Sequence, residues 1–155
     1  MAMGGLYYEQ FSVGQRFEHV LRRTVTEADN LIFSTLTHNP AALHLDEEAM
    51  KSSEFGTRIV NSCFTLSLMV GISVADTTLG TTIANLGWDE VRFPRPVFIG
   101  DTLRIETSVL EMRESRSRPD SGIVTFTHRA YNQRDEEVGS CKRIALMKKL
   151  PREAA

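Results

Sequence analysis

Two histidines, an amide and a carboxylate lie within ten residues of one another, in the segment 37–46 with the sequence THNPAALHLD. An imidazole has an ordinary pKa of about 6.5, so His38 or His44 is suited to take up and return a proton near neutral pH. The amide of Asn39 can both donate and accept a hydrogen bond, which suits it to hold a water molecule or a carbonyl group. These residue types indicate acid–base chemistry, and a loop in which they only satisfy backbone groups is the equally weighted alternative.

The same segment offers a second chemistry, because His38, His44 and Asp46 are all possible metal ligands. Their spacing matches no recognised zinc pattern, and neither Cys63 nor Cys141 is close to them in the sequence. We therefore expect no metal at this segment.

A second candidate site is the sequence Asn61-Ser62-Cys63, which leads into an apolar run. Backbone N–H groups at a helix N-terminus have no partner within the helix and favour developing negative charge, as an oxyanion hole requires. Asn61 or Ser62 can also act as a simple helix cap. For Cys63 a nucleophilic thiolate is one interpretation, but the apolar run beside it favours a buried thiol, which we expect.

The first element that must position these residues is a helix after Thr26. Thr26 with Asp29 three residues later is similar to a capping box, and it predicts where this helix begins. Ala28, Ile32 and Leu36 then fall on one face of the helix. The proline that follows at position 40 ends it.

The next elements are a loop, a short helix and a long helix. Residues 37–45 are predicted to form the loop, and residues 46–51 a short helix with acidic residues in its first turn. Residues 62–75 predict a long core helix. Its expected apolar face consists of Phe64, Leu68, Gly71, Ile72 and Ala75.

The rest of the chain predicts strands joined by turns. Residues 15–25 alternate weakly and predict a strand, and residues 81–91 predict a bulged strand or a strand pair. A half-buried strand is expected from the alternation of Leu103, Ile105, Thr107 and Val109 with polar residues. Further strands are expected at 124–130, with His128 on the apolar face, and at 138–148, after turns at 116–122 and 132–137. The pattern predicts an α+β fold in which one long central helix is wrapped by an antiparallel β-sheet.

Composition narrows the class of protein. The 155 residues correspond to one domain, which we expect over 1–155 with an ordered core over 7–149 and a frayed tail at 150–155. The 18 basic and 20 acidic residues nearly balance, which argues against a nucleic-acid or membrane-surface binder. The two cysteines make no disulfide framework and indicate buried thiols in a reducing compartment. Without a signal peptide or a long apolar run, we expect a cytoplasmic protein.

Other common catalytic motifs are missing from the sequence. It contains no G-x-S-x-G motif, no phosphate-binding loop and no dinucleotide fingerprint. Six basic residues are candidates to bind a phosphorylated ligand, although as a group they are typical of an ordinary solvated surface. They are Arg92, Arg95, Lys142, Arg143, Lys148 and Lys149.

Three segments of the chain resemble the MaoC-like dehydratases of the hotdog fold, the group that contains (R)-specific enoyl-CoA hydratases. The first is Asn39-Pro40 followed by Leu43-His44-Leu45-Asp46, and the second is Ile59-Val60-Asn61-Ser62-Cys63-Phe64-Thr65. The third, residues 93–103, is similar to the family pattern F-x-x-P-V-x-x-G-D-T-L. The sequence THNPAALHLD at residues 37–46 most resembles the branch of the family associated with mesaconyl-CoA or methylmalyl-CoA hydratases.

The resemblance implies a catalytic Asp and His five residues apart, which activate water for syn addition to an enoyl thioester. His44 matches the family histidine, but Asn39 stands where the family has Asp, or Thr37 if the alignment follows Asn-Pro. An amide cannot act as a base, so Asn39 is expected to orient the water while His44 transfers the proton. His38 and Asp46 are possible assisting groups. Ser62 replaces the usual glycine at the helix start, and the oxyanion role falls to the N–H of Ser62 or Cys63.

The function expected from this resemblance is the interconversion of a 2-enoyl-CoA and a 3-hydroxyacyl-CoA. The expected acyl group is short or branched, with a dicarboxylic group like that of mesaconyl-CoA as one candidate. CoA would be part of the substrate, and no cofactor is implied. The family implies a homodimer or higher homo-oligomer with sites near the subunit interface. Two alternatives remain: a hotdog thioesterase, which needs a carboxylate that residues 59–66 lack, and a non-catalytic acyl-CoA binder, which the missing Asp favours.

Overall fold

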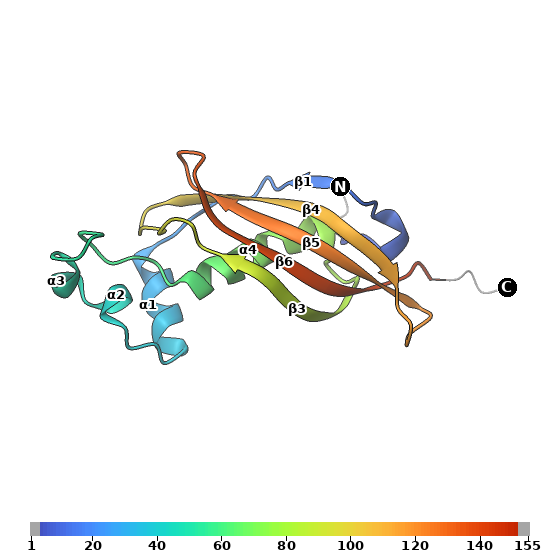
Figure 1. Ribbon diagram of the computed structural model, residues 1–155, viewed down its shortest axis with the longest axis horizontal. Coiled ribbons are helices and arrows are strands. Elements are labelled where there is room, and N and C mark those ends of the chain that lie inside the picture. The colour runs from blue at the N-terminus through green and yellow to red at the C-terminus, as the bar shows by residue number, and fades with distance from the viewer. Residues whose placement is uncertain (1–3, 152–155) are drawn as a thin grey trace.

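The computed structural model describes residues 4–151, so the part of the expected tail at 152–155 lies outside the described residues. The helices are a 3-10 turn at Tyr8–Gln10, α1 (Glu27–Leu36), α2 (Ala42–Leu45), α3 (Glu47–Met50) and α4 (Ser62–Thr77). The strands are β1 (Arg16–Glu18), β2 (Arg23–Thr24), β3 (Thr82–Arg92), β4 (Thr102–Glu114), β5 (Ser121–Tyr131) and β6 (Glu137–Lys148). Figure 1 shows that α1, α2 and α3 gather at one end of the molecule, beyond the sheet.

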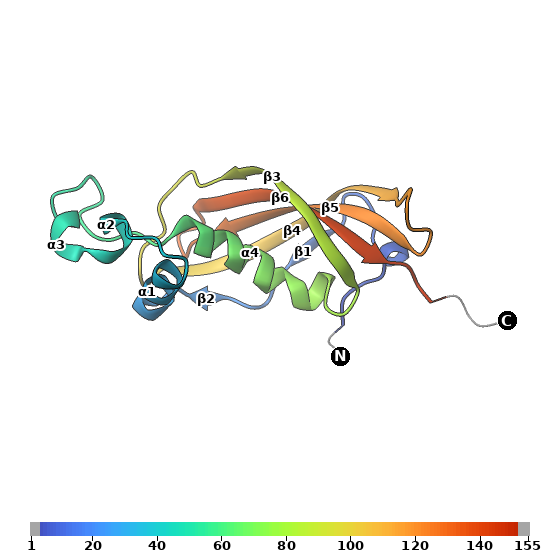
Figure 2. The same ribbon diagram turned by 90° about the horizontal axis from the view of Figure 1, so that it is seen from below.

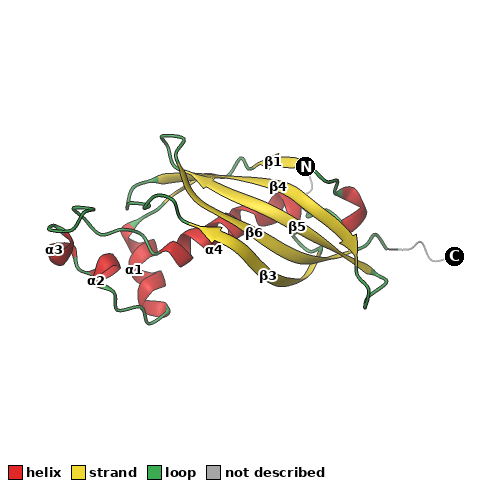
Figure 3. Ribbon diagram, in the orientation of Figure 1, coloured by secondary structure: helices red, strands yellow, loops and turns green. Residues whose placement is uncertain are grey.

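The strands form one antiparallel sheet in the order β1-β4-β5-β6-β3, and β2 also pairs with β4. The view from below in Figure 2 shows α4 lying along one face of this sheet, with its first residues toward α1 and α2. Figure 3 shows the same two layers, a long helix against a curved sheet. The predicted α+β layout, one long helix wrapped by an antiparallel sheet, is confirmed.

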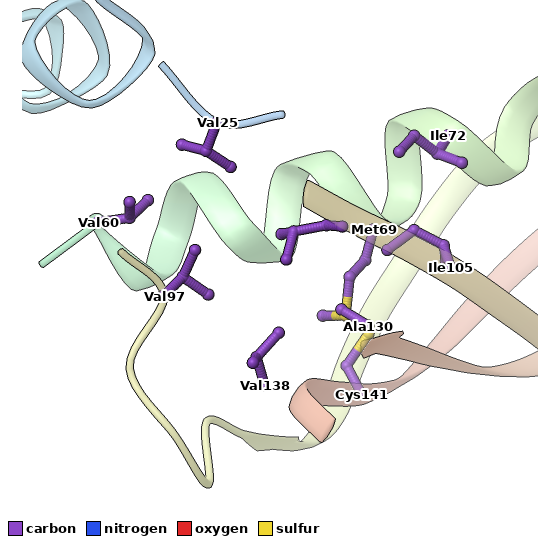
Figure 4. Packing of buried hydrophobic residues seen from close by; sticks show 10 residues of the cluster. Val25, Val60, Met69, Ile72, Val97, Ile105, Ala130, Val138 and Cys141 are labelled. Atoms are coloured by element: carbon purple, nitrogen blue, oxygen red, sulfur yellow. The ribbon is translucent and has the colours of Figure 1, made fainter. Parts of the chain in front are cut away.

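The core lies between α4 and the inner face of the sheet. The predicted inward residues of β4 are all buried, and so are Val124, Phe126, His128 and Ala130 of β5. Met69 and Ile72 of α4 belong to a cluster with Ile105, Ala130 and Cys141 (Figure 4). Each apolar side chain buried in this way contributes about 1.5–3 kcal/mol of hydrophobic stabilisation. This packing fixes α4, and with it the start of α4, against the sheet.

The predicted inward face of α4 is partly wrong. The buried residues are Thr65, Met69, Ile72, Ser73 and Thr77, while Phe64 and Leu68 are half-buried and Gly71 is exposed. The run is apolar nearly all round, so its pattern does not indicate which side meets the sheet. The expectation of a buried thiol at Cys63 is also wrong, because Cys63 is exposed, whereas Cys141 is buried.

Helix α1 turns its polar face inward, whereas the periodicity of its apolar residues suggests that the apolar face is the buried one. The capping box between Thr26 and Asp29 is confirmed, but Ile32 is 63% exposed and Leu36 is 76% exposed. The buried residues of α1 are Asn30 and Ser34. Periodicity separates an apolar from a polar face, and here the polar face turns inward because it finds hydrogen-bond partners there.

Smaller differences concern the segments around α1. The strand expected over 15–25 is broken into β1 and β2, and the predicted loop 37–45 contains the short helix α2. The short helix predicted at 46–51 is confirmed as α3, and β3 is a single strand with three register shifts, as a bulged strand requires. None of the helices within residues 4–151 has both the length and the apolar character needed to cross a lipid bilayer.

Candidate functional site

His44 is held in one orientation on α2. Its side chain is buried, and its Nδ1 lies 2.9 Å from the carbonyl oxygen of Ile59. Because a carbonyl oxygen only accepts, Nδ1 must carry the proton. The neutral imidazole therefore presents Nε2 as an unprotonated acceptor. This is the tautomer that a general base needs.

The main chain at His44 and the start of α4 are connected through α1. The Nδ2 of Asn30 donates to the carbonyl oxygen of His44 over 3.0 Å, and the Oδ1 of Asn30 accepts from the N–H of Asn61 over 2.9 Å. The hydroxyl of Ser34 accepts from the Nδ2 of Asn61 over 3.3 Å. The two segments singled out in the sequence are thus joined by buried polar side chains.

The start of α4 leaves one backbone donor free. Asn61 is the N-cap, and its Oδ1 accepts from the N–H of Cys63 over 3.0 Å. Its carbonyl oxygen accepts from the N–H of Phe64 over 3.0 Å. The N–H of Ser62 has no hydrogen-bond partner within residues 4–151. Of the two predicted oxyanion donors, Ser62 is therefore available, while the N–H of Cys63 is engaged by the cap.

A pocket of about 210 Å³ opens beside Ser62. Its lining is mostly apolar and comprises Phe55, Ile59, Val60, Ser62, Thr65, Phe93, Pro94, Arg95, Pro96, Val97 and Val138. Larger hollows of about 340 and 1010 Å³ exist elsewhere, but neither is lined by Ser62 or Ile59. His44 itself does not line this pocket, but its imidazole is bonded to the carbonyl of Ile59, which does. The smaller pocket thus combines an apolar lining and the free N–H of Ser62 with a residue that holds the imidazole.

Residues 93–97 of the loop 93–101 form one wall of this pocket, and the loop is fastened to the segment that leads into α4. The carbonyl of Val97 accepts from the N–H of Val60 over 2.8 Å. Buried Asp101 stabilises the loop, since its Oδ2 accepts from the N–H of Phe98 over 2.9 Å. Gly100 has a φ of +94°, which a side chain would strain. Gly100 and Asp101 of the third motif therefore stabilise the loop whose residues 93–97 line the pocket.

The other predicted site residues have local structural partners. The Oδ1 of Asn39 accepts from the N–H of Ala41 over 3.0 Å, so only its Nδ2 is free to donate. The carboxylate of Asp46 caps α3 by accepting from the N–H of Ala49 over 3.0 Å. His38 is exposed at the end of α1, with a φ of +55°. The structure shows no hydrogen bond between any of these side chains and the imidazole of His44 within residues 4–151.

An ion-pair cluster fastens α3 and α1 to the chain before α4. Arg58 donates to Glu47 over 2.8 Å and to Glu27 over 2.9 Å. Hydrogen bonds from Arg58 and from Thr57 lower the pKa of Glu47 to about 2. The Arg58 guanidinium is therefore engaged with carboxylates, and it is not available for a phosphorylated ligand.

Of the six basic residues considered for CoA, only Arg95 lines the pocket. Arg143 is buried and donates to Asn85, Lys142 pairs with Glu90, and Lys149 pairs with Glu114. Within residues 4–151 no group of three or more His, Cys, Asp and Glu side chains is arranged to hold a metal ion.

Residues 9–132 match the family described as MaoC like domain. The chain belongs to the MaoC-like dehydratase family. The named relatives in this family include enoyl-CoA hydratases and dehydratases. The structure places the motifs that resembled the family: His44 lies on α2, Asn61 and Ser62 lie at the start of α4, and residues 93–97 of the third motif line the pocket.

Two curated relatives of this MaoC-like chain are similar over 145 residues. One is a mesaconyl-CoA hydratase of Cereibacter sphaeroides, 32% identical over 94% of this chain and 42% of the relative. The other is a β-methylmalyl-CoA dehydratase of Chloroflexus aurantiacus, 30% identical over 94% of this chain and 41% of the relative. The chain thus spans about two-fifths of the length of these relatives.

Solved structures place the MaoC-like chain among hotdog folds. A MaoC-like dehydratase from Rhodospirillum rubrum is 31% identical, with a TM-score of 0.83 over 96% of this chain and all of the other. A Mycobacterium tuberculosis protein with a double hotdog fold is 22% identical, with a TM-score of 0.87 over 100% of this chain and 48% of the other. The second likeness shows the fold alone, and it confirms the hotdog architecture.

Two buried residues of this site, Asn30 and Ser34, were not predicted from the sequence. They sit at helical spacing between the apolar residues of α1, where polar residues ordinarily face water. Only the reversed orientation of α1 brings them to Asn61. Nothing in the local pattern signals that reversal.

Proposed function

We propose that this chain interconverts a 2-enoyl-CoA and a 3-hydroxyacyl-CoA, with His44 as the acid–base residue. The observation that carries the proposal is the hydrogen bond between Nδ1 of His44 and the carbonyl of Ile59, a residue that also lines the pocket. This bond leaves Nε2 unprotonated, and it ties the imidazole to a residue of the pocket lining. The names of the relatives and the family support the substrate class.

In the hydration direction, Nε2 of His44 takes a proton from water, and the oxygen of that water forms a bond to C3 of the enoyl thioester. The electrons of the C2=C3 bond move toward the thioester carbonyl, whose oxygen becomes an enolate oxygen. The imidazolium then returns its proton to C2. One water is added, the histidine is restored, and no other reactant is needed. The free Nδ2 of Asn39 donates to the attacking water.

The N–H of Ser62 is the donor for the enolate oxygen. It lies in the first turn of α4, where the helix dipole also favours negative charge. A donor aimed at a developing oxyanion is typically worth about 10²–10³ in rate. The hydroxyl of Ser62 adds a polar group that a glycine would lack.

The pocket favours a short or branched acyl group. Its volume of about 210 Å³ and its apolar lining suit a chain of few carbons. Arg95 is the one charged residue among those that line it. A guanidinium pairs well with a carboxylate or a phosphate, so Arg95 suits either a dicarboxylic acyl group such as mesaconyl or the CoA carrier.

We also propose that the chain forms a homodimer through β3. Among residues 4–151 this strand ends the sheet, so one row of its backbone groups has no described strand beside it. Its exposed apolar residues include Leu86, Trp88 and Val91. Unpaired strand edges with apolar side chains are a ready surface for pairing with another chain.

The test is a panel of acyl-CoA thioesters incubated with the protein and analysed by mass spectrometry. We expect crotonyl-CoA and mesaconyl-CoA to gain the mass of one water. A free acid and free CoA would instead identify a thioesterase. Retention of the ligands without any change in mass would identify a non-catalytic binder, and either result would overturn the proposal.

A further inference from the structure

Asn30 lies at the centre of the contacts between α1, α2 and the start of α4, and its side chain is fully buried. Its two amide groups face two different segments: Nδ2 donates to the carbonyl of His44, and Oδ1 accepts from the N–H of Asn61. Ser34, one turn further along α1, is equally buried and accepts from the side chain of Asn61. These inward polar residues hold the two candidate catalytic segments at once.

Core packing explains only part of this arrangement, because Phe33 of α1 packs against Phe64 of α4 while most of the apolar face of α1 turns outward. Ile32 and Leu36 remain largely exposed while an amide and a hydroxyl are buried. Buried polar groups need partners, and hydrogen bonds require a narrow range of distances and angles, whereas apolar contacts tolerate sliding. A polar inward face therefore sets the relative position of the joined segments more narrowly than an apolar face would.

We propose that Asn30 is a positioning residue for hydration, which sets the placement of Nε2 of His44 relative to the N–H of Ser62. The proposal rests on the proposed function. Asn30 holds the main chain of His44, whose ring is held separately by Ile59, and it holds Asn61, which directly precedes Ser62. Asn30 does not line the pocket.

Because Asn30 acts through other residues, its replacement should lower kcat with little change in KM. A displacement of about 1 Å at a reacting group can cost about 100-fold in rate. We therefore expect Asn30→Ala to lower the kcat for crotonyl-CoA about 10- to 100-fold. The folded state of each variant is checked by circular dichroism at the assay temperature.

Asn30→Asp gives a sharper test, because the replacement has the same shape and its donor depends on pH. An ionised carboxylate still accepts from the N–H of Asn61 but cannot donate to the carbonyl of His44, whereas a protonated carboxyl restores that donor. Burial raises the pKa of such a carboxyl. Relative to wild type at each pH, the kcat of Asn30→Asp should therefore recover as the pH is lowered, and that of Asn30→Ala should not.

The matched control is Thr77→Val, which removes another fully buried hydrogen bond at the far end of α4. It should lower the melting temperature and leave kcat unchanged. A folded Asn30 variant with wild-type kcat, or an Asp variant without recovery at low pH, would overturn the positioning role. Failure of both variants to fold would assign Asn30 to folding and overturn the role as well.

Hydrogen exchange at the amide of Asn61 separates this proposal from the proposed function. The amide should be protected in wild type and exchange faster in Asn30→Ala, whatever the protein catalyses. If the amide of Asn61 exchanges faster in Asn30→Ala while kcat is unaltered, the positioning role of Asn30 is contradicted and the proposed function is not. A wild-type protein that hydrates no enoyl-CoA contradicts the proposed function instead.

Discussion

The Nδ1–H of His44 donates to the carbonyl oxygen of Ile59 over 2.9 Å. This contact assigns the tautomer of the imidazole and joins α2 to the extended segment that leads into α4. Ile59 is fixed in turn, since its N–H donates to the carbonyl of Leu43 over 3.1 Å. The proposed base is therefore held by a pair of reciprocal bonds between its own segment and the wall of the pocket.

Replacement of Ser62 by proline tests the oxyanion donor without removing the helix. Ser62 is the first residue of α4, where proline is well tolerated, and the ψ of 123° at Asn61 suits a residue before proline. Ser62→Pro removes the N–H together with the hydroxyl, and the loss of the N–H should lower the initial rate of crotonyl-CoA hydration about 10²–10³-fold relative to Ser62→Ala, which lacks only the hydroxyl. Ser62→Ala keeps the N–H and should stay near the wild-type rate. Equal rates for the two variants would exclude the N–H as the donor.

The two cysteines should differ in reactivity. Cys63 is exposed next to Ser62, whereas Cys141 is buried and burial raises its pKa to about 11. We expect a disulfide-exchange reagent to label Cys63 alone in the folded protein, and acyl-CoA to slow this labelling. Cys63→Ser should keep the hydration rate, because no step uses the thiol. An inactive but folded Cys63→Ser protein would point to a nucleophilic thiol instead.

Acid should unfold the protein partly through His128. Burial first, then the positive charge of Arg143 and a contribution from His19, lower the pKa of His128 to about 3. Below pH 6.5 the unfolded chain gains a proton on this imidazole, but the folded chain does not until about pH 3. The free energy of unfolding should therefore fall as the pH drops through this window, by up to about 4 kcal/mol.

The measurement for His128 is urea unfolding at several pH values between 7 and 3.5, in wild type and His128→Gln. Glutamine keeps a polar partner for the hydroxyl of Thr107, which lies 2.9 Å from Nδ1 of His128. The variant should lose less stability than wild type on acidification, since the other titrating groups are the same. Parallel curves for the two proteins would show that His128 does not carry the acid sensitivity.

Self-association should depend on the edge strand β3. The double variant Leu86→Lys and Trp88→Lys places charges on that edge, which disfavours pairing with another strand. We expect a dimer for wild type and a monomer for this variant in sedimentation velocity at the same concentration. The matched control, Val20→Lys with Leu110→Lys, changes exposed apolar residues outside β3 and should remain dimeric. A monomeric wild type would contradict the dimer.

Most of the fold follows from local patterns. The alternation from Leu103 to Val109, the capping box at Thr26 and the apolar run after Asn61 predicted β4, α1 and α4 within a few residues. These signals depend on neighbours along the chain. The hydratase-like segments were also found, because they are contiguous in the sequence.

The remaining features depend on contacts between distant segments. The burial of the Asn30 side chain depends on its hydrogen bond with Asn61, which lies 31 residues away. The tautomer of His44 depends on the carbonyl of Ile59. Every residue has a backbone carbonyl, so the residue type at position 59 does not indicate that its carbonyl accepts from His44. Asn39 shows the converse: its type indicated water binding, but its Oδ1 is satisfied by the N–H of Ala41, two residues away.

The most direct test of the account is the initial rate of crotonyl-CoA hydration in wild type and in His44→Gln, at equal concentrations of folded protein. Glutamine can keep a hydrogen bond to the carbonyl of Ile59 but cannot take up a proton. We predict turnover in wild type and a rate lower by about 100- to 10,000-fold in the variant. An unchanged rate in His44→Gln would contradict the role of His44 as the acid–base residue.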